Sequence, residues 1–433
     1  MTRFSDKCKE LIDLNGTTIY RLSKDHSLEL TTLQRMATGK RLPNQEFFNR
    51  FCNCLSINDT EKKELSELYK IELLGENTYL CRQCILELFS QLSHKKFSES
   101  VQKDSFSSNN LFFDTLVETS YLPDNHIIFS IINEIFESNH ESCIYSNLPP
   151  IQQIYSQLQK LSKTNKKIQF LHLLHFQIDN SHSLSNLQSF TQIIQFISSS
   201  SLAYYPYYFY THMPSMEKYS LLFPYYFITK DKIIYFSSNL NKYIYITEKK
   251  VIESHIQAFT KIIRQSCALI HRLDTHYQPV FQNSNYNDSY DFYFSFSPLS
   301  FIKNQVNENH MKDNSIYFFS KTFFDQLFDL EKNDVLQATI NKLKLILEHP
   351  IIDHCYMLDN NIPIPSEQII HIEKNPIITV WKNPSSEKQG FFIQESSIYN
   401  AFYDFAQSLI SESIAYDPNK TKKMLQDTIE QLK

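Results

Sequence analysis

The sequence predicts a multidomain protein, in which a small all-α domain at the N-terminus is followed by a larger mixed α+β region. Its 433 residues are enough to bury more than one hydrophobic core. Apolar residues recur at helical spacing up to about residue 93, whereas strand-length runs of Tyr, Phe and Ile appear beyond residue 200. The expected parts are a helical domain at 1–76, a helix and polar linker at 77–110, and a mixed α+β region at 111–433 that can be divided near residue 200.

Five short helices are expected in the N-terminal domain, because each apolar stretch has a residue suited to begin or end a helix. The first and third stop at Gly16 and Gly39, since glycine readily adopts the left-handed conformation that closes a helix. Asn44 and Asn58 are suited to cap the fourth and fifth helices, because their side chains can accept hydrogen bonds from the first turn. A sixth helix is expected over 77–93, before the serine-rich part of the linker.

Residues 18–43 have the spacing of a helix-turn-helix motif. Leu22, Leu28 and Leu33 fall where the second helix, the turn and the third helix must share one core. Ser27 occupies the turn itself. The pattern therefore predicts two helices that cross closely around one small core.

A glycine, two basic residues and a proline follow the third helix, as Gly39, Lys40, Arg41 and Pro43. Together with the three leucines, they make the N-terminal domain resemble the XRE family, whose fold is that of the lambda and 434 repressors and Cro. The family usually has glycine at the turn position that Ser27 occupies here. The resemblance implies a lambda-repressor-like helical bundle, double-stranded DNA as the partner, and a role as a transcriptional regulator.

The resemblance also implies roles for individual residues. In the family the third helix lies in the major groove, and its first residues face the base edges. An arginine at that place can bond O6 and N7 of a guanine. The residues implied to contact bases are Leu30, Thr31, Thr32, Gln34 and Arg35. Lys40, Arg41 and the backbone near Thr18 are implied to contact phosphates, which gives affinity without sequence information.

The distribution of charge agrees with a DNA partner at the N-terminus only. The formal net charge of the whole chain is -5, which excludes a generally basic surface. Residues 1–50 contain nine Lys or Arg against six Asp or Glu, so nine minus six leaves a local balance of +3. Any contact with nucleic acid is therefore expected in this segment.

Beyond the linker the sequence predicts both helices and strands. Residues 112–200 have a mainly helical pattern. Two runs of Tyr, Phe and Ile within residues 225–238 predict a β-hairpin, with Lys230 and Asp231 between them. A helix is expected from about 249 to 270.

A strand followed by a helix occurs in two places with a similar pattern, which suggests a duplicated unit. The aligned residues are Ile246 with Ile393, Glu248 with Glu395, and Val251 with Ile398. Because the match is only a few residues long, convergent patterning of two unrelated segments is the alternative.

An aromatic run, YYPYYFYTHM, and a later FPYYF are unusual enough to consider as the wall of a ligand pocket. The polar fringe of such a pocket would be Tyr207, Tyr210, His212 and Tyr226. The alternative is a set of core and edge strands, where Tyr and Phe are also favoured.

No metal site, cofactor or enzyme activity is expected. Cys81 and Cys84 form a CxxC on an expected helix without a second cysteine pair, and zinc needs four ligands. His172 and His175 are expected as buried or partly buried histidines of an apolar helix. Four glycines in the whole chain exclude the glycine-rich phosphate loops of NTPases, dehydrogenases and kinases. A G-x-S-x-G nucleophile elbow is also absent from the sequence.

The leading hypothesis is a transcriptional regulator that binds an inverted-repeat operator as a homodimer. The C-terminal region is expected to dimerise, to sense a small-molecule or peptide effector, or both. A cytoplasmic protein without a membrane span is expected, because no apolar run has the length of a signal peptide or a membrane helix. Two alternatives stay open: the helix-turn-helix could serve as a protein-protein interaction module, or an enzyme could carry a regulatory DNA-binding domain.

Overall fold

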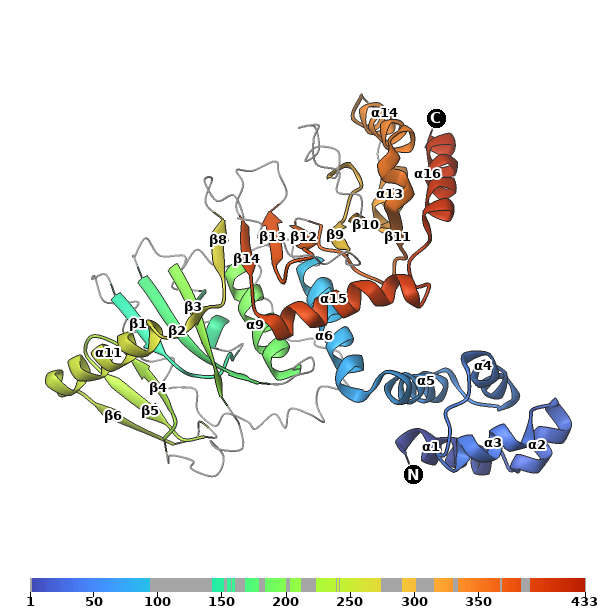
Figure 1. Ribbon diagram of the computed structural model, residues 1–433, viewed down its shortest axis with the longest axis horizontal. Coiled ribbons are helices and arrows are strands. Elements are labelled where there is room, and N and C mark those ends of the chain that lie inside the picture. The colour runs from blue at the N-terminus through green and yellow to red at the C-terminus, as the bar shows by residue number, and fades with distance from the viewer. Residues whose placement is uncertain are drawn as a thin grey trace. The chain divides into compact units, whose positions relative to one another are not determined.

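The computed structural model divides the chain into two compact units, Met1–Gln83 and Cys84–Lys433. Helices make up the first unit, and the second contains two mixed β-sheets with helices packed against them (Figure 1). A multidomain protein with an α-helical N-terminal part and a mixed α/β remainder is thereby confirmed. The described residues are 2–93, 142–151, 154–156, 158–159, 168–178, 184–199, 203–211, 223–238, 240, 242–273, 290–300, 315–329, 334–366, 368–382 and 390–432.

The five helices expected in the N-terminal domain are all present in the first unit. They are α1 (Arg3–Leu14), α2 (Ile19–His26), α3 (Leu30–Ala37), α4 (Gln45–Cys54) and α5 (Asp59–Leu74). Asn44 and Asn58 cap α4 and α5 as expected, each accepting a hydrogen bond from a backbone N–H of the first turn. One apolar cluster, which includes Phe4, Phe48 and Tyr69, joins all five helices. The first unit therefore has a core of its own.

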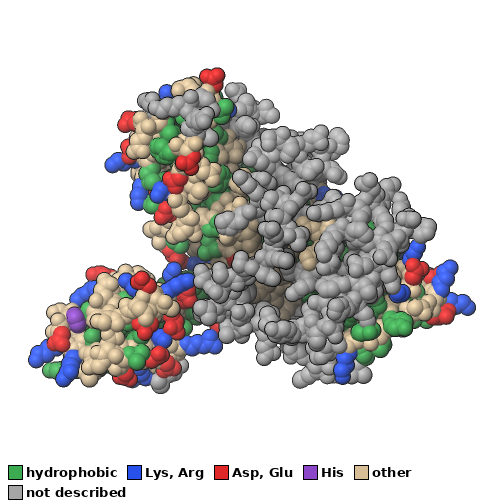
Figure 2. All heavy atoms as spheres, turned by 180° about the vertical axis from the view of Figure 1, so that it is seen from behind, with side chains coloured by type: hydrophobic (Ala, Val, Ile, Leu, Met, Phe, Trp, Pro, Cys, Tyr) green, Lys and Arg blue, Asp and Glu red, His purple; other side chains and the backbone are tan. Residues whose placement is uncertain are grey.

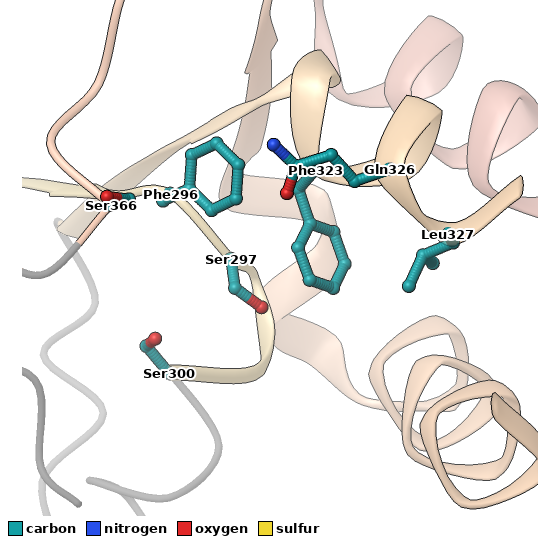
Figure 3. A pocket seen from close by; sticks show the side chains of 7 residues that line it. All are labelled: Phe296, Ser297, Ser300, Phe323, Gln326, Leu327 and Ser366. Carbon is teal, nitrogen blue, oxygen red and sulfur yellow. The ribbon is translucent and has the colours of Figure 1, made fainter. Parts of the chain in front are cut away.

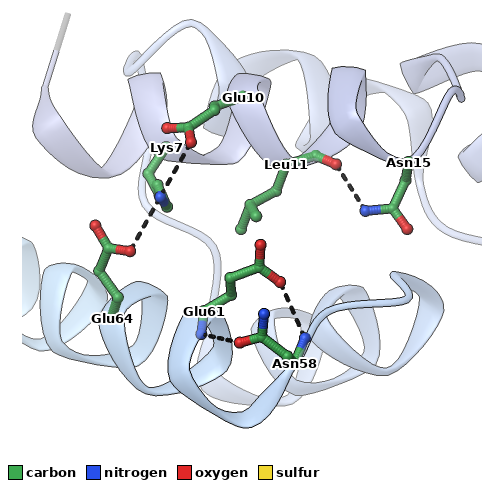
Figure 4. A network of polar contacts seen from close by, with 7 residues as sticks. All are labelled: Lys7, Glu10, Leu11, Asn15, Asn58, Glu61 and Glu64. Atoms are coloured by element: carbon green, nitrogen blue, oxygen red, sulfur yellow. Dashed lines mark hydrogen bonds and ion pairs between the residues drawn. The ribbon is translucent and has the colours of Figure 1, made fainter.

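An ionic network fastens α1 to α5 (Figure 4). Lys7 Nζ lies 3.0 Å from Glu64 Oε2 on α5 and 3.2 Å from Glu10 Oε1 on its own helix. The hydrogen bond to Glu64 favours the charged ammonium, so the pKa of Lys7 is raised. Near the end of α1, the Asn15 amide donates to the Leu11 carbonyl at 2.8 Å. These contacts stabilise the helix against which α3 packs.

α6 (Glu76–Ser93) is the helix expected over 77–93, and its second half belongs to the second unit. Phe89 is fully buried there, with its ring centroid 5.4 Å from that of Phe294 and 5.8 Å from that of Phe405. Edge-to-face packing of this kind adds to the stabilisation from burial. The end of α6 is thus part of a hydrophobic core, and the linker expected at 94–110 lies outside the described residues.

The first sheet has the strand order β6-β5-β4-β1-β2-β3-β7. Its strands β1, β2 and β3 are parallel to one another, whereas β4, β5, β6 and β7 pair antiparallel to their neighbours. The bounds are β1 (Ser142–Ser146), β2 (Ile168–Gln177), β3 (Ala203–Thr211), β4 (Tyr225–Ile228), β5 (Ile233–Phe236), β6 (Tyr243–Ile246) and β7 (Cys267–Ala268). Two helices belong to this half, α9 (Leu184–Ser199) and α11 (Lys249–Ile263).

The second sheet has the order β11-β10-β9-β12-β13-β14-β8. The strands are β8 (His271–Leu273), β9 (Asp291–Ser295), β10 (Ser315–Ser320), β11 (Cys355–Leu358), β12 (Gln368–Ile372), β13 (Ile378–Lys382) and β14 (Gly390–Ile393). The helical elements of this half are α13 (Lys321–Phe328), α14 (Asp334–Glu348), a short 3₁₀-helix (Pro350–His354), α15 (Ser396–Ser411) and α16 (Pro418–Leu432).

The two sheets repeat one topology. Strands β1 to β6 and β9 to β14 occur in the same spatial order, with the same parallel and antiparallel pairings. The register agrees as well, because the first residue of β5 pairs with the last of β6 and the first of β13 with the last of β14. A helix joins the second and third parallel strands in both halves, as α9 and α14, and another follows the sixth strand, as α11 and α15.

The short sequence alignment of the two strand-to-helix segments falls on equivalent places of this repeat. Ile246 and Ile393 end β6 and β14, while Glu248 and Glu395 are the N-cap residues of α11 and α15. The suggested repetition is therefore confirmed as a structural one. It extends over the six-stranded core of each sheet rather than over one strand and one helix.

Two expectations about secondary structure are wrong. Within residues 112–200, the described segments 142–146 and 168–177 are the strands β1 and β2 rather than helix. The stretch FLHLLHF is part of β2, an inner strand that is buried along one face and mostly half-buried along the other, where Leu173 alone is buried. Because leucines occupy the less buried face as well, at Leu171 and Leu173, the sequence lacks the alternation of apolar and polar residues that distinguishes a strand from a helix. The helix expected at 249–270 ends at Ile263, and β7 follows it.

The hairpin expected within residues 225–238 is confirmed as β4 and β5. Its turn has no glycine, and the Thr229 hydroxyl stabilises the turn by hydrogen bonds to the backbone. Thr229 Oγ1 accepts hydrogen bonds from the backbone N–H of Lys232 at 3.1 Å and of Asp231 at 3.3 Å. A side chain that bonds the backbone two or three residues later stabilises such a turn without positive φ angles.

His172 lies in the core of the first sheet, as expected, but on a strand. Its Nε2–H donates to the Leu148 carbonyl at 2.6 Å, and its Nδ1 is 2.8 Å from the Tyr204 hydroxyl. The Tyr155 hydroxyl lies 3.0 Å from that of Tyr204 and completes the network. Burial disfavours the imidazolium and lowers the pKa of His172 to about 4. A neutral, fully bonded histidine of this kind has a structural role.

Candidate nucleic-acid interface

The turn between α2 and α3 is defined by a capped helix start and one left-handed residue. Thr18 caps α2, with its hydroxyl accepting from the Arg21 N–H at 3.2 Å. Ser27 ends α2 in the left-handed region, with φ 53° and ψ 38°. Glycine adopts this conformation without a steric cost, and serine tolerates it less well. The Arg50 guanidinium on α4 donates to the Ser27 carbonyl at 3.0 Å and so supports the turn.

The three leucines that predict the motif share one core. Leu22, Leu28 and Leu33 are buried and belong to the apolar cluster of the first unit. The Ser23 hydroxyl at the helix crossing donates to the Leu28 carbonyl at 2.7 Å. The small residue therefore allows close packing and also satisfies a carbonyl of the turn.

One face of α3 is exposed and polar. Thr31, Gln34 and Arg35 are exposed there, while Leu30 and Thr32 are half-buried. The Thr32 hydroxyl donates to the Glu29 carboxylate at 2.6 Å. The residues expected to contact bases therefore divide into three that are open to solvent and two that are partly covered.

The segment after α3 brings two more cations to the surface. Gly39 has a φ of 68°, and a Cβ at this position would lie 3.1 Å from the Ser5 hydroxyl. The Arg35 carbonyl accepts hydrogen bonds from the N–H groups of Lys40 at 2.9 Å and Arg41 at 3.3 Å. These hydrogen bonds hold the backbone of Lys40 and Arg41 next to the last turn of α3, and both side chains are exposed there.

The basic side chains of this region are available to an external anion. Among the described residues, none forms an ion pair with Arg35, Lys40 or Arg41. Figure 2 shows Lys and Arg side chains interspersed with acidic ones on the face of the first unit that it presents. On the face that this view presents, the cations are separated by acidic side chains rather than gathered in one continuous patch.

These groups suit the reading of a duplex in chemical terms. A guanidinium presents two parallel N–H donors that match O6 and N7 of guanine, and a glutamine amide can pair with adenine. Threonine supplies a hydroxyl and a methyl, which can meet a phosphate or a thymine methyl. Thr18 is exposed and caps the start of α2, where the first N–H groups of a helix have no partner within the helix.

Of the residues expected in an aromatic pocket, Tyr207 and Tyr226 lie near one cluster, whereas Tyr210 points elsewhere. Tyr207 on β3 and Tyr226 on β4 pack against an apolar cluster with Phe259 of α11. Tyr210 is three residues along β3 and therefore points to the opposite face of the sheet. Its hydroxyl donates to the Glu395 carboxylate at 2.6 Å. His212 lies outside the described residues.

A hollow of about 230 Å³ occurs in the second half of the C-terminal unit (Figure 3). It is lined by Phe296, Ser297, Ser300, Phe323, Gln326, Leu327 and Ser366. Sequence reasoning missed this place, because the residues come from distant segments and form no local motif. Its polar groups are hydroxyls and one amide, which can hold a ligand but cannot exchange protons near neutral pH.

Cys81 and Cys84 are buried in α6. In the described parts of the chain, no three His, Cys, Asp or Glu side chains gather closely enough to hold a metal ion. No described helix is long and apolar enough to cross a membrane. The chain matches no protein-family model and no curated protein sequence. Its function must therefore be inferred from its own residues and geometry.

Proposed function

We propose that this protein is a sequence-specific, DNA-binding transcriptional regulator of the lambda-repressor-like kind, which acts as a homodimer through its C-terminal region. The observation that supports this most strongly is the α2-turn-α3 unit. Its three buried leucines, left-handed Ser27 and exposed Arg35 combine the packing, the turn and the base-reading group of a recognition helix.

The role of the C-terminal region follows from the size of the DNA contact. One recognition helix reaches only a few base pairs, which is too little to distinguish one site among millions. Two copies joined in a twofold arrangement read an inverted repeat with half-site centres about 34 Å apart, or a multiple of that distance. The second unit is the larger surface and the better candidate for the twofold contact. A small molecule or peptide bound there would regulate occupancy through its preference for one dimer geometry.

Two substitutions in the full-length chain separate base reading from phosphate contact. We expect Arg35→Ala to reduce discrimination at one or two base pairs by roughly 1–3 kcal/mol each. We expect Lys40→Ala to weaken binding to all duplex sequences alike. It should also lower the slope of log affinity against log salt concentration by about one. The measurement is the dissociation constant on a selected duplex and on its single-base variants, over a range of salt concentrations.

Lys70→Ala is the matched control, because it removes one exposed charge from α5 rather than from the α3 region. It should change neither the discrimination nor the salt slope. Unaltered specificity in Arg35→Ala would show that α3 does not read bases in this register. Absence of any duplex binding at low salt would favour a protein-protein role for the helix-turn-helix, and turnover of a substrate would favour an enzyme with a regulatory domain.

A further inference from the structure

The outer edge of the first sheet is unusually apolar and open. β6 is the last strand at this edge, and it pairs with β5 on its inner side. Tyr243, Ile244 and Tyr245 on this strand are 46%, 47% and 66% exposed. Exposed edge strands normally carry charges, prolines or bulges that prevent another strand from pairing with them. The β6 sequence has none of these between Tyr243 and Ile246.

The structural repeat shows what covers the same edge in the other half. There the equivalent strand is β14, and the chain's own β8 pairs antiparallel with it. Phe391 and Phe392 occupy the places of Ile244 and Tyr245, and both are buried. The fold therefore accommodates an added antiparallel strand at this position, and in the first half no strand among the described residues occupies it.

The backbone of β6 is oriented to accept such a strand. The Ser237 N–H donates to the Lys242 carbonyl at 2.9 Å, which makes these two residues a hydrogen-bonded pair of β5 and β6. Hydrogen-bonded pairs alternate along an antiparallel ladder, so every second residue directs its N–H and C=O groups toward β5. The N–H and C=O groups of Tyr243, Tyr245 and Thr247 therefore point outward from the sheet.

We propose that β6 is the dimerisation edge of this protein, where it pairs antiparallel with β6 of a second copy of the chain. Two identical strands related by a twofold axis perpendicular to the sheet always bring residues of the same face opposite each other. Tyr243, Tyr245 and Thr247 share one face of β6, and Ile244 and Ile246 share the other. In such a dimer, residues of the first set lie opposite each other across the two strands, and isoleucines lie opposite isoleucines. The choice of a second copy of this chain as the partner strand rests in part on the proposed function, which requires a twofold dimer.

Charge complementarity selects one register. When Tyr245 pairs with Tyr245 of the partner subunit, Ile244 lies opposite the partner's Ile246 and Lys242 lies opposite the partner's Glu248. Lys242 and Glu248 are both exposed, and neither forms an ion pair with another described residue. Opposite charges across a strand pair are favourable. The dimer would contain this pair twice and would join two seven-stranded sheets into one.

The first test is the association of the full-length chain in the absence of DNA, measured by sedimentation equilibrium. Wild type should form a dimer. Tyr245→Lys should raise the dimer dissociation constant by at least about tenfold, because it places two like charges directly opposite each other. Leu345→Lys is the matched control, since Leu345 is an exposed apolar residue of α14 and its replacement should leave the dimer intact.

Two charge reversals test the register. Lys242→Glu alone and Glu248→Lys alone should each weaken the dimer about tenfold, because each replaces two attractive pairs by two repulsive ones. The double variant restores opposite charges and should regain most of the affinity. A double variant as weak as either single variant would exclude this register.

Cysteine cross-linking tests the geometry directly. Tyr245→Cys brings two thiols to opposite positions of a hydrogen-bonded pair, where the Cα atoms are about 5.5 Å apart and a disulfide can form. Tyr243→Cys is the control, because in this register the two cysteines lie four residues apart along the strands, roughly 14 Å. Mild oxidation should therefore give a covalent dimer with Tyr245→Cys beyond the wild-type background, and none with Tyr243→Cys.

The outcomes distinguish this proposal from the proposed function. A monomeric wild type, or a dimer that Tyr245→Lys leaves intact, overturns the β6 interface whatever the DNA measurements show. Protection of β6 amides from hydrogen exchange in a monomer would mean that another segment of the same chain covers the edge. Conversely, a chain that dimerises through β6 and binds no duplex at low salt would retain the interface and lose the DNA-binding role.

Discussion

Leu33→Ala is expected to lower the free energy of unfolding of the first unit by about 3 kcal/mol and to abolish specific DNA binding. Leu33 is fully buried and lies in the core that α2, the turn and α3 share. Its replacement removes apolar contacts and leaves a cavity at the place where α3 is held. Because α3 would then no longer be fixed relative to α2, both stability and base reading should be lost together.

The measurement must follow the first unit alone, since a chain with two units does not unfold in one step. The single tryptophan, Trp381, lies in β13 and so reports on the second unit only. Hydrogen exchange resolved by peptide is suitable: protection should fall in α1 to α5 and stay unchanged in the sheets. Leu14→Ala is the control, because Leu14 is 67% exposed and its loss should change stability by less than about 0.5 kcal/mol.

Inserting five base pairs between the two half-sites of a selected operator is expected to reduce binding to the level of non-specific duplex. Five base pairs rotate one half-site by about half a turn, so that the two recognition helices of a twofold dimer cannot meet both half-sites. The expected loss is on the order of a thousandfold, which is the lower end of the usual difference between specific and non-specific binding.

Inserting ten base pairs returns the half-sites to one side of the duplex and should restore part of the affinity. The measurement is a competition of the three duplexes for the full-length chain at one salt concentration. Equal binding to the operator with and without five extra base pairs would mean that the two recognition helices act independently. A dimer-deficient Tyr245→Lys chain should bind all three duplexes with the same low affinity.

The helical bundle could be predicted in detail because its signals are local. Asn44 and Asn58 cap helices through contacts three residues away, and the three leucines of the helix-turn-helix lie within one short stretch. Ser27 stands at a turn position where the family usually has glycine, and it still adopts the left-handed conformation that glycine favours. The exposed and buried sides of α3 followed from the same spacing.

The C-terminal region was harder to predict because its structure depends on contacts between distant residues. β2 has leucines on its less buried face, at Leu171 and Leu173, so its sequence has no period that separates strand from helix. The repeat is visible in the sequence only around Glu248 and Glu395. The two halves have the same strand order and strand pairing, but few identical residues at equivalent positions. Tyr207 and Tyr210 are close in sequence, but residues three apart on a strand point to opposite faces of the sheet, so the aromatic run does not line one pocket.

The most direct test of the proposed function is the ratio of two dissociation constants, measured for the full-length protein at one salt concentration. One duplex carries the sequence enriched from a random library, and the other has the same length and composition in scrambled order. The proposal predicts an enriched inverted repeat that binds at least about a thousandfold more tightly than the scrambled duplex, with most of that ratio lost in Arg35→Ala. A ratio near one, or an enriched sequence without inverted symmetry, would contradict it.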